Sequence, residues 1–581
     1  MKRTKRIFAI FMTLALAMSM LIVSSAVSFA ADVPTYSLTI TKDASDKVAH
    51  KYDAYQLFKG EMDSSGKLTK IQWGRDVVNA TDGGYGELIA DINSALGLTG
   101  ADALPSDATA TAVARAINDV RAKDANAKDD DAMAQALADA FSKHITASPI
   151  KSVNVAANET SGTISGLEAG YYLIKDGSTV SEEGAYTRFI LQLTNNETIN
   201  VTEKASVPSV TKKVKEKNDS EAASATNPTG WQDAADYDIG DKIPYKLEGT
   251  LPSTFADYDT YKTYTFTDTL STGLTVKADD VKVHFNTEDG TDISGLFDIA
   301  VNGQTLTVSL KEGVDLKTAK AGEASFTKDS KIIVLYDATL NENAVIGSGG
   351  NPNEVELEFS NNPNFNGQGD KGKTPKDKVI VFTYEIKALK VAPTTAAAIS
   401  QTEYDALSDA DKSNYVKIGD KWQETAPLEG AEFTLYKKQG TTETEVGKIS
   451  TGSTFEFKGT DAGVYVLKET KVPAGYTKAE DIEITVTATY DTESADPKLK
   501  SLTVTPETAG FTVAVTETKD DEGKVTEIST NGIISGKVLN TDGAVLPATG
   551  GIGTIIFYVL GSLLVVGCGI VLISKRRMES R

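Results

Sequence analysis

Alternating apolar and polar positions dominate the chain between residues 36 and 516. Short runs in which Thr, Val, Tyr and Ile alternate with polar residues are separated by Gly, Asn and Asp. A period of two is typical of half-buried strands, and the separating residues are typical of turns. The clearest runs lie at residues 36–40, 331–336, 354–359, 482–490 and 511–516. The pattern predicts a mainly β protein, built from β-sandwich domains in series.

Residues 107–148 break this alternation. Apolar positions recur there at helical spacing in two sets, Ala112, Val113, Ala116, Ile117 and Val120, then Met133, Ala136, Leu137 and Phe141. This spacing predicts two amphipathic helices inserted in the first domain. A second insert of lower complexity runs over residues 393–427, with a short helix expected within residues 400–415.

Both ends of the chain carry long apolar segments. Residues 1–30 combine the basic start MKRTKR, an apolar run and the small residues Ser28 and Ala30, which predicts a secretory signal peptide. Residues 551–574 are apolar and uncharged, and a basic tail follows at 575–581. Their length predicts a transmembrane helix, and the tail is expected in the cytoplasm.

The exported part is too long for one hydrophobic core. We expect three domains, at residues 31–205, 206–375 and 376–545, the last of which holds the insert 393–427. The net charge of −22 argues against nucleic-acid binding. The chain's one cysteine, Cys568, lies in the apolar C-terminal segment, so the exported part contains no disulfide.

The chain shows no motif of a metal site or of an enzyme. Its three histidines are scattered and form no H-E-x-x-H or Cys/His cluster, so we expect no metal and no cofactor. No nucleophile elbow occurs. A secreted hydrolase therefore finds no support.

The segment before the apolar C-terminus reads Leu546-Pro547-Ala548-Thr549-Gly550. Together with the apolar segment and the basic tail, it resembles the LPXTG cell-wall sorting signal of Gram-positive surface proteins. The resemblance implies that a sortase cysteine attacks the Thr549 carbonyl, releases the chain from Gly550 onward, and passes the acyl group to an amine. The protein would then be a substrate in covalent acyl transfer.

The third domain contains "LEGAEFTLYKK" (428–438), "GVYVLKETKVPAGY" (463–476) and "KVLN" (537–540). These resemble the CnaB-type, Ig-like domain of Gram-positive pilins and adhesins. The resemblance implies an amide bond between Lys390 and Asn540, promoted by Glu469. Burial suits these residue types, because it lowers the pKa of an amine and keeps a carboxyl protonated. Such an acid can pass a proton to departing ammonia.

The second domain contains "PSVTKKV" (208–214), "YTFTDTLSTGL" (264–274) and "NPNEVELEFSNNPN" (351–364). It resembles the isopeptide-forming, CnaA-like D2 domain of backbone pilins. The resemblance implies Lys212 as nucleophile, with Lys213 as the alternative, and Asp268 as the promoting acid. Asn353, at the opening of the last expected strand, is the first choice as acceptor, and Asn361 is its rival.

The first domain echoes the third in "EAGYYLIKDG" (168–177), where Asp176 falls at the place of Glu469. Lys42 could be its first-strand lysine. Several asparagines compete as the acceptor, namely Asn195, Asn196 and Asn200. Whether this domain forms an isopeptide bond stays open.

Nearly the whole chain resembles a sortase-assembled backbone (major) pilin. Such pilins offer the amine of a lysine in a V-x-V-Y-P-K motif, which places the pilin lysine at Lys204 of "INVTEK", with Thr202 and Glu203 in place of Tyr-Pro. The resemblance implies a structural shaft subunit of a surface pilus, anchored to the cell wall, with a role in adhesion.

The partners implied are identical subunits, minor pilins, a class C pilin sortase, a housekeeping sortase, peptidoglycan and host surface ligands. The alternative is a monomeric wall-anchored adhesin that binds a host matrix protein.

Overall fold

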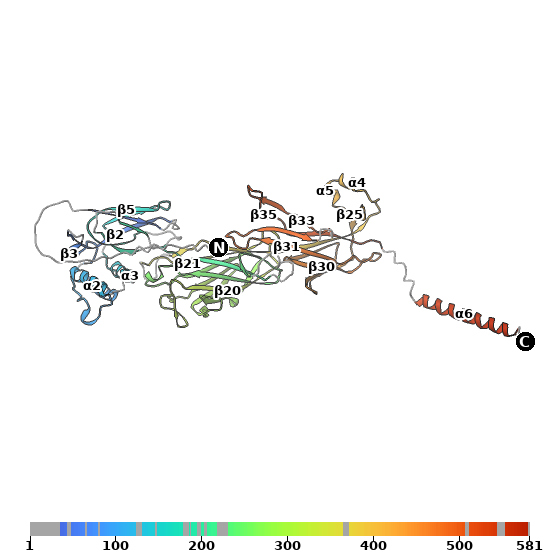
Figure 1. Cartoon of the computed structure of the whole chain (residues 1–581), viewed down its shortest axis with the longest axis horizontal. Coiled ribbons are helices and arrows are strands. Elements are labelled where there is room, and N and C mark those ends of the chain that lie inside the picture. The colour runs from blue at the N-terminus through green and yellow to red at the C-terminus, as the bar shows by residue number, and fades with distance from the viewer. Residues whose placement is uncertain are drawn as a thin grey trace, which may run out of the picture.

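Three β domains follow one another in a row, and a separate helix lies beyond the last of them (Figure 1). The structure is a computed structural model. It describes residues 35–42, 48–63, 67–78, 82–123, 130–145, 148–177, 185, 188–193, 199–202, 206–217, 230–363, 371–505, 510–542 and 552–578. The signal peptide predicted at residues 1–30 lies outside the described residues.

The first domain has two sheets, ordered β5-β1-β8 and β3-β2-β6-β7, with β4 beside β2. Its strands are β1 (Tyr36–Thr41), β2 (His50–Met62), β3 (Leu68–Trp73), β4 (Lys151–Val155), β5 (Ser161–Leu167), β6 (Gly170–Asp176), β7 (Arg188–Leu193) and β8 (Ile199–Thr202). Between β3 and β4 lie α1 (Tyr85–Ala95), the 3₁₀ turn η1 (Gly100–Asp102), α2 (Ala110–Lys123) and α3 (Asp130–Ser142).

The two helices predicted in this domain are confirmed as α2 and α3, whereas α1 was not predicted. Leu88, Ile89 and Ile92 of α1 are buried and follow helical spacing. Four glycines in and around the segment, at 83, 84, 86 and 97, indicated turns instead. Packing of the apolar face against the sheet core overrides that local preference.

The second domain is a sandwich of two sheets. Their orders are β10-β9-β12-β20-β14, with β15 beside β20, and β11-β23-β21-β13-β17-β16, with β22 beside β21. The first sheet holds β9 (Val210–Glu216), β10 (Gly230–Gln232), β12 (Lys242–Thr250), β14 (Leu274–Val276), β15 (Lys282–Phe285) and β20 (Lys331–Leu340). The second holds β11 (Ala234–Asp236), β13 (Tyr264–Leu270), β16 (Phe297–Asn302), β17 (Thr305–Leu310), β21 (Asn351–Ser360), β22 (Lys371–Lys373) and β23 (Asp377–Phe382).

Shorter elements complete this domain: η3 (Phe255–Asp257), η4 (Ala278–Asp280), η5 (Ser294–Leu296) and the ribbon of β18 (Lys320–Ala321) and β19 (Ala324–Ser325). Strand β23 pairs with β21. The second domain therefore extends beyond residue 375, where the sequence prediction ended it, and β21 is not its last strand.

The third domain has sheets ordered β25-β26-β24-β36-β33, with β29 beside β24, and β28-β27-β30-β31-β32. The first comprises β24 (Tyr384–Pro393), β25 (Tyr415–Ile418), β26 (Lys421–Pro427), β29 (Thr454–Thr460), β33 (Thr512–Val513) and β36 (Ile533–Leu539). The second comprises β27 (Glu432–Gln439), β28 (Thr442–Ile449), β30 (Gly463–Lys471), β31 (Ile482–Tyr490) and β32 (Leu499–Thr505). A separate ribbon pairs β34 (Thr516–Lys519) with β35 (Val525–Ser529). The single strand predicted at 511–516 is therefore divided between β33 and the start of β34.

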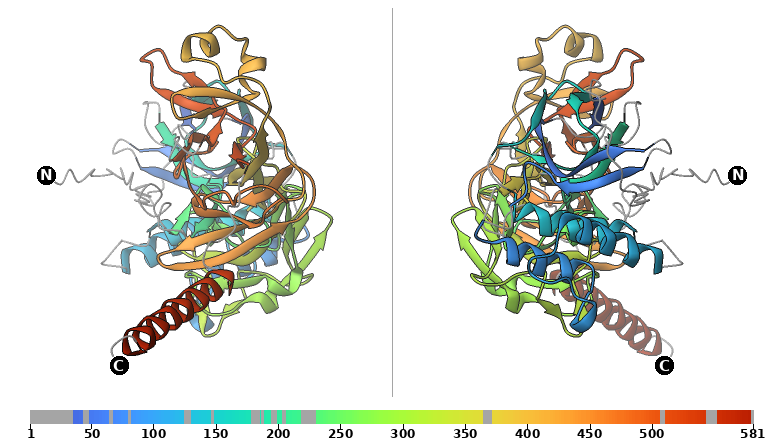
Figure 2. Two further views of the ribbon diagram at one scale, coloured as in Figure 1. Left: turned by 90° about the vertical axis from the view of Figure 1, so that its right-hand side faces the viewer. Right: turned by 90° about the vertical axis from the view of Figure 1, so that its left-hand side faces the viewer.

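The insert 393–427 protrudes from one side of the row (Figure 2). It contains α4 (Gln401–Asp405) and α5 (Asp409–Lys412), followed by the hairpin of β25 and β26. The predicted short helix is thus confirmed, and Ser400 and Glu403 close its first turn as a capping box.

The C-terminal segment forms α6 (Ile552–Met578). Among the described residues, no helix is both long enough and apolar enough to cross a membrane. The transmembrane assignment of residues 551–574 stays a prediction from the sequence.

Buried polar contacts join the second and third domains. Asp238 accepts a hydrogen bond from the main-chain nitrogen of Asp461 at 2.9 Å, and Lys437 bridges the two carboxylates at 2.7 and 2.8 Å. The main-chain nitrogen of Ile239 donates to the carbonyl of Gly459 at 2.8 Å. Gly459 has φ +76°, and a Cβ atom there would lie 2.3 Å from Ile239. This close approach of the two domains therefore requires glycine.

In a second set of contacts at this joint, two carboxyl groups lie beside the hydroxyl of Tyr490. The Tyr490 hydroxyl donates to Glu216 Oε2 at 2.8 Å and lies 3.3 Å from Asp236 Oδ1. The other carboxyl oxygen of Asp236 accepts from the main-chain nitrogen of Ala462 at 2.8 Å. Burial, and then the charge of Glu216, raise the pKa of Asp236 well above its usual range. A proton on Asp236 removes the repulsion between the two carboxylates.

The joint should weaken as pH rises. The folded protein keeps a proton on Asp236 that the unfolded chain releases near pH 4, so stability falls from about pH 4 up to the folded pKa. We expect the melting temperature of residues 31–545 to fall more with rising pH in the wild type than in Asp236→Asn, which keeps the hydrogen bonds without titrating. Parallel pH profiles for the two proteins would contradict this assignment.

Candidate functional site: two buried lysine, acid and asparagine clusters

In the third domain, three predicted residues meet between the two sheets. Lys390 lies on β24, and Asn540 directly follows β36, which runs parallel to β24. The main-chain nitrogen of Asn540 donates to the carbonyl of Val391 at 3.0 Å, which holds the end of β36 beside the lysine. Glu469 reaches the pair from β30 of the opposite sheet. All three side chains are buried, with at most 2% exposed.

One oxygen of Glu469 contacts both reacting groups of this cluster. Oε1 lies 3.1 Å from Lys390 Nζ and accepts from Asn540 Nδ2 at 3.0 Å. Lys390 Nζ also contacts Asn540 Oδ1. The second oxygen, Oε2, accepts from the main-chain nitrogen of Ala479 at 2.7 Å, which fixes the carboxyl in place. The acid can therefore take a proton from the amine and deliver one to the amide nitrogen.

Burial favours the reactive form of the lysine. It lowers the pKa of Lys390, against the opposing effect of Glu469. The ring of Phe433 lies 5.3 Å from the amine and is itself buried. The apolar wall beside the amine favours its neutral, nucleophilic form.

In the second domain, the cluster draws on both sheets. Lys212 lies on β9 of one sheet, whereas Asp268 and Asn353 lie on the neighbouring strands β13 and β21 of the other. All three are fully buried. Lys212 Nζ contacts Asp268 Oδ1 at 2.5 Å. Burial lowers the pKa of Lys212 and raises that of Asp268, which favours a neutral amine beside a neutral acid.

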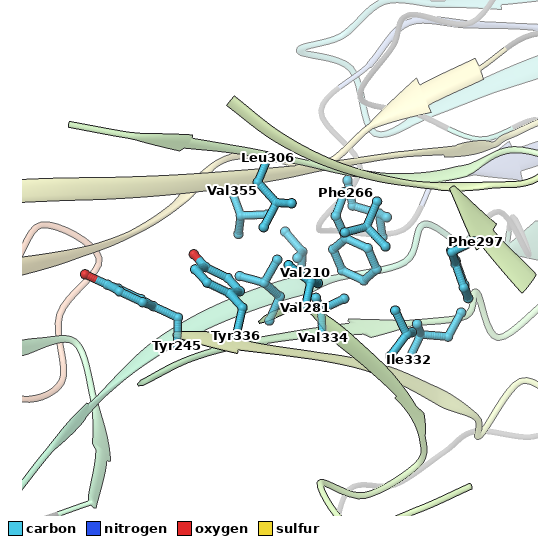
Figure 3. Close-up of a cluster of buried hydrophobic side chains, with 14 of the residues drawn as sticks. Val210, Tyr245, Phe266, Val281, Phe297, Leu306, Ile332, Val334, Tyr336 and Val355 are labelled. Atoms are coloured by element: carbon cyan, nitrogen blue, oxygen red, sulfur yellow. The ribbon is translucent and has the colours of Figure 1, made fainter. Parts of the chain in front are cut away.

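The sequence did not indicate one member of this cluster, Tyr336 on β20. Its hydroxyl accepts from Lys212 Nζ at 3.0 Å and from Asn353 Nδ2 at 2.8 Å, and donates to Asp268 Oδ2. Figure 3 shows its ring beside that of Tyr245, with the hydroxyl pointing toward the strand that carries Val355. The only sequence signal was an alternating strand with Tyr at an inward position, which is typical of any sandwich core.

The cluster favours Lys212 and Asn353 over the rival residues. The amine of Lys213 points away from the core, is partly exposed and pairs with Asp233 at 2.6 Å. Asn353 shares the Tyr336 hydroxyl with Lys212 and Asp268. Asn361 is also buried, but it follows the end of β21. The choice of Lys212 and Asn353 stays a prediction that rests on this geometry.

Three parts of the chain match known protein families. Residues 239–363 match the model of the Gram-positive pilin backbone subunit 2, Cna-B-like domain. Residues 414–498 match a prealbumin-like fold domain, and residues 539–580 match the LPXTG cell wall anchor motif. Together with the relatives below, these matches support a sortase-assembled backbone pilin. Its anchor motif makes the pilin a cell-wall-anchored surface protein.

The chain is similar to surface proteins of Streptococcus pyogenes and Corynebacterium diphtheriae. It is 26% identical over 427 residues to the trypsin-resistant surface T6 protein of Streptococcus pyogenes, covering 64% of this chain and 70% of that one. The solved T6 backbone pilin covers 89% of this chain and 100% of its own at 17% identity, with a TM-score of 0.49. The major pilin SpaD of Corynebacterium diphtheriae covers 88% and 98% at 15% identity, with a TM-score of 0.40.

The first domain of the pilin has a different arrangement. Lys42 is buried, and its amine donates to the carbonyls of Val48, Ala156 and Ala157 at 2.5, 3.3 and 3.4 Å. Asp176 instead pairs with His50 at 2.9 Å. Of the candidate acceptors, Asn195 and Asn196 lie outside the described residues, and only the backbone of Asn200, in β8, is described.

Other predicted sites fall outside the described part of the chain. These are the pilin lysine Lys204 and the sorting motif, Leu546, Pro547, Ala548, Thr549 and Gly550. Within the described part, no three His, Cys, Asp or Glu side chains gather as a metal site.

Four substitutions should distinguish the rival residues of the second domain. Lys212→Arg and Asn353→Ala each remove a reacting group, so the exported pilin should lose one ammonia fewer than the wild type. The matched variants Lys213→Arg and Asn361→Ala should keep the wild-type deficit, and intact mass spectrometry measures all four. The unlinked second domain should also lose about 5 kcal/mol of stability, the loop entropy of a cross-link of this span. A normal deficit in Asn353→Ala together with a reduced one in Asn361→Ala would reverse the assignment.

Proposed function

We propose that the pilin is the shaft subunit of a covalent surface pilus, in which sortase joins the Thr549 carbonyl of one subunit to Lys204 of the next. The sorting-signal match supports processing by sortase. Lys204 follows β8, at the passage from the first domain to the second. Such a bond is a head-to-tail contact between unlike surfaces, which propagates without closing and gives a fibre.

The two buried clusters support internal amide bonds, and they are the observation that carries this proposal. Lys212 would bond to Asn353, and Lys390 to Asn540, each with loss of ammonia. Asp268 and Glu469 promote these reactions once per molecule, so the protein has no turnover and is not an enzyme. In the absence of disulfides in the exported part, these bonds supply its covalent cross-links.

The bonds would also shorten the path of tension. A pull between Lys204 and the C-terminus reaches Lys390 on β24 and passes directly to Asn540, 150 residues later in the chain. The strands between these residues then carry no load. In the second domain, the bond relieves residues 213–352 in the same way. Tension still passes from Asn353 through β23 into β24, beside which the buried polar joint lies.

The proposed partners follow from this role. A class C pilin sortase would form the links between identical subunits and minor pilins, and a housekeeping sortase would transfer the fibre to peptidoglycan. Polymer formation distinguishes the two candidate functions. A polymer would support a pilus shaft with a role in adhesion to host surfaces, whereas a monomer would support the wall-anchored adhesin.

Polymerisation should depend on one lysine. When the pilin is expressed with a class C sortase, we expect a ladder of SDS-resistant species that Lys204→Arg abolishes, because the guanidinium is not an acyl acceptor. Lys213→Arg, nine residues along and outside the proposed link, should leave the ladder intact. A ladder that persists in Lys204→Arg would assign the link to another lysine. The absence of a ladder in the wild type would favour the monomeric adhesin.

A further inference from the structure

The two clusters differ in how the acid reaches the asparagine. In the third domain, Glu469 Oε1 directly contacts both Lys390 Nζ and Asn540 Nδ2. In the second domain, the shorter Asp268 contacts Lys212, whereas Asn353 Nδ2 is held by the Tyr336 hydroxyl. That hydroxyl also contacts the second oxygen of Asp268. Tyr336 therefore occupies the gap left by the shorter acid.

We propose that Tyr336 is a catalytic residue of the second domain, which carries the proton from Asp268 to the departing nitrogen of Asn353. The inference rests on the proposed amide bond between Lys212 and Asn353, and it adds the route of the proton. A hydroxyl suits this task because it donates one hydrogen and accepts others, and its hydrogen can turn toward either neighbour.

The step balances without any further reactant. The neutral Lys212 Nζ attacks Asn353 Cγ, and the Nζ–Cγ bond forms as the Cγ–Nδ2 bond breaks. The Tyr336 hydrogen turns from Oδ2 toward Nδ2, so that Oδ2 can hold the proton of the neutral acid and donate it. Nζ gives one proton to Asp268 Oδ1, while the proton on Oδ2 passes to the Tyr336 oxygen. The Tyr336 hydrogen passes to Nδ2, which leaves as ammonia. Asp268 and Tyr336 end in their starting protonation states.

The surroundings of Tyr336 keep this relay dry and in place. Its side chain is 3% exposed and stacks on Tyr245, with the ring centroids 5.3 Å apart. Lys212 Nζ lies 5.2 and 5.5 Å from these two ring centroids. The carboxamide oxygen of Asn353 meets no hydrogen-bond criterion with any described residue.

Tyr336→Phe tests the relay, because it removes the hydroxyl and keeps the ring. The exported pilin is made by cell-free synthesis, quenched in acid at successive times and digested for peptide mass mapping. We expect the Lys212–Asn353 amide to form about a hundredfold more slowly, the lower end of what general acid–base catalysis contributes. The Lys390–Asn540 amide of the same molecule should form at its wild-type rate, which shows that the chain has folded.

Tyr264→Phe is the matched control. Tyr264 is equally buried in the second domain, but its hydroxyl donates to the Thr250 carbonyl at 2.8 Å. This variant should lose a comparable hydrogen bond and still form both amides at the wild-type rate. Equal slowing in Tyr264→Phe and Tyr336→Phe would indicate a stability effect and overturn the relay.

A rescue variant separates chemistry from packing. Asp268→Glu combined with Tyr336→Phe lengthens the acid by one methylene where an oxygen has been removed, so the carboxyl can reach Asn353 as Glu469 reaches Asn540. We expect the double variant to form the amide faster than Tyr336→Phe alone. No rescue, or a wild-type rate in Tyr336→Phe, would overturn the proposal. If the wild type itself lacks the second-domain amide, the proposed bond fails first, and the relay falls with it.

Discussion

Burial of a lysine amine against a carboxyl, between two apolar sheets, is the constraint on which this pilin depends. Separate charges in such a place cost several kcal/mol each, so burial and proton transfer favour a neutral amine and a neutral acid. These are the forms that can react with a nearby carboxamide. The sandwich that excludes water for stability therefore also prepares the chemistry, and aromatic rings beside Lys212 and Lys390 complete the dry pocket in each domain.

The same principle extends to the joint between the second and third domains. There, buried carboxyls remain paired with lysine, tyrosine and main-chain donors instead of reacting. Lys437 differs from Lys212 in lying between two carboxylates. An ion pair is the stable outcome of that environment. The amides proposed within the domains and the polar joint between them would together stiffen the exported part, which has no disulfide.

The strands, helices and site residues that a local sequence pattern marks could be predicted. Alternation gave the strands β20, β21 and β31, and helical spacing gave α2 and α3. Glu469 and Asn540 could be predicted as site residues because flanking motifs mark their strands. Tyr336 could not be found, since its role depends on the meeting of four strands and no motif surrounds it. The joint between Asp238 and Lys437 joins residues 199 positions apart, and nothing in either segment indicates the other.

The misplaced end of the second domain and the helix α1, which was not predicted, have the same physical origin. Residues 377–382 were not predicted as a strand of the second domain, and it is the pairing of β23 with β21 and β11 that assigns them there. The segment of α1 has only a short apolar repeat, and glycines lie near its ends. Packing of that repeat against the rest of the domain makes the segment helical. Local preference indicates an element, whereas its partners across the sandwich determine which sheet and which domain it joins.

The most direct measurement is the intact mass of the exported chain, residues 31–545, made without sortase. Each internal amide releases one ammonia. The two buried clusters predict a mass lower than that of the sequence by two ammonias, with the linked peptides joining Lys212 to Asn353 and Lys390 to Asn540. A mass equal to that of the sequence would contradict the central claim, because the buried lysines and acids would then persist as unreacted pairs.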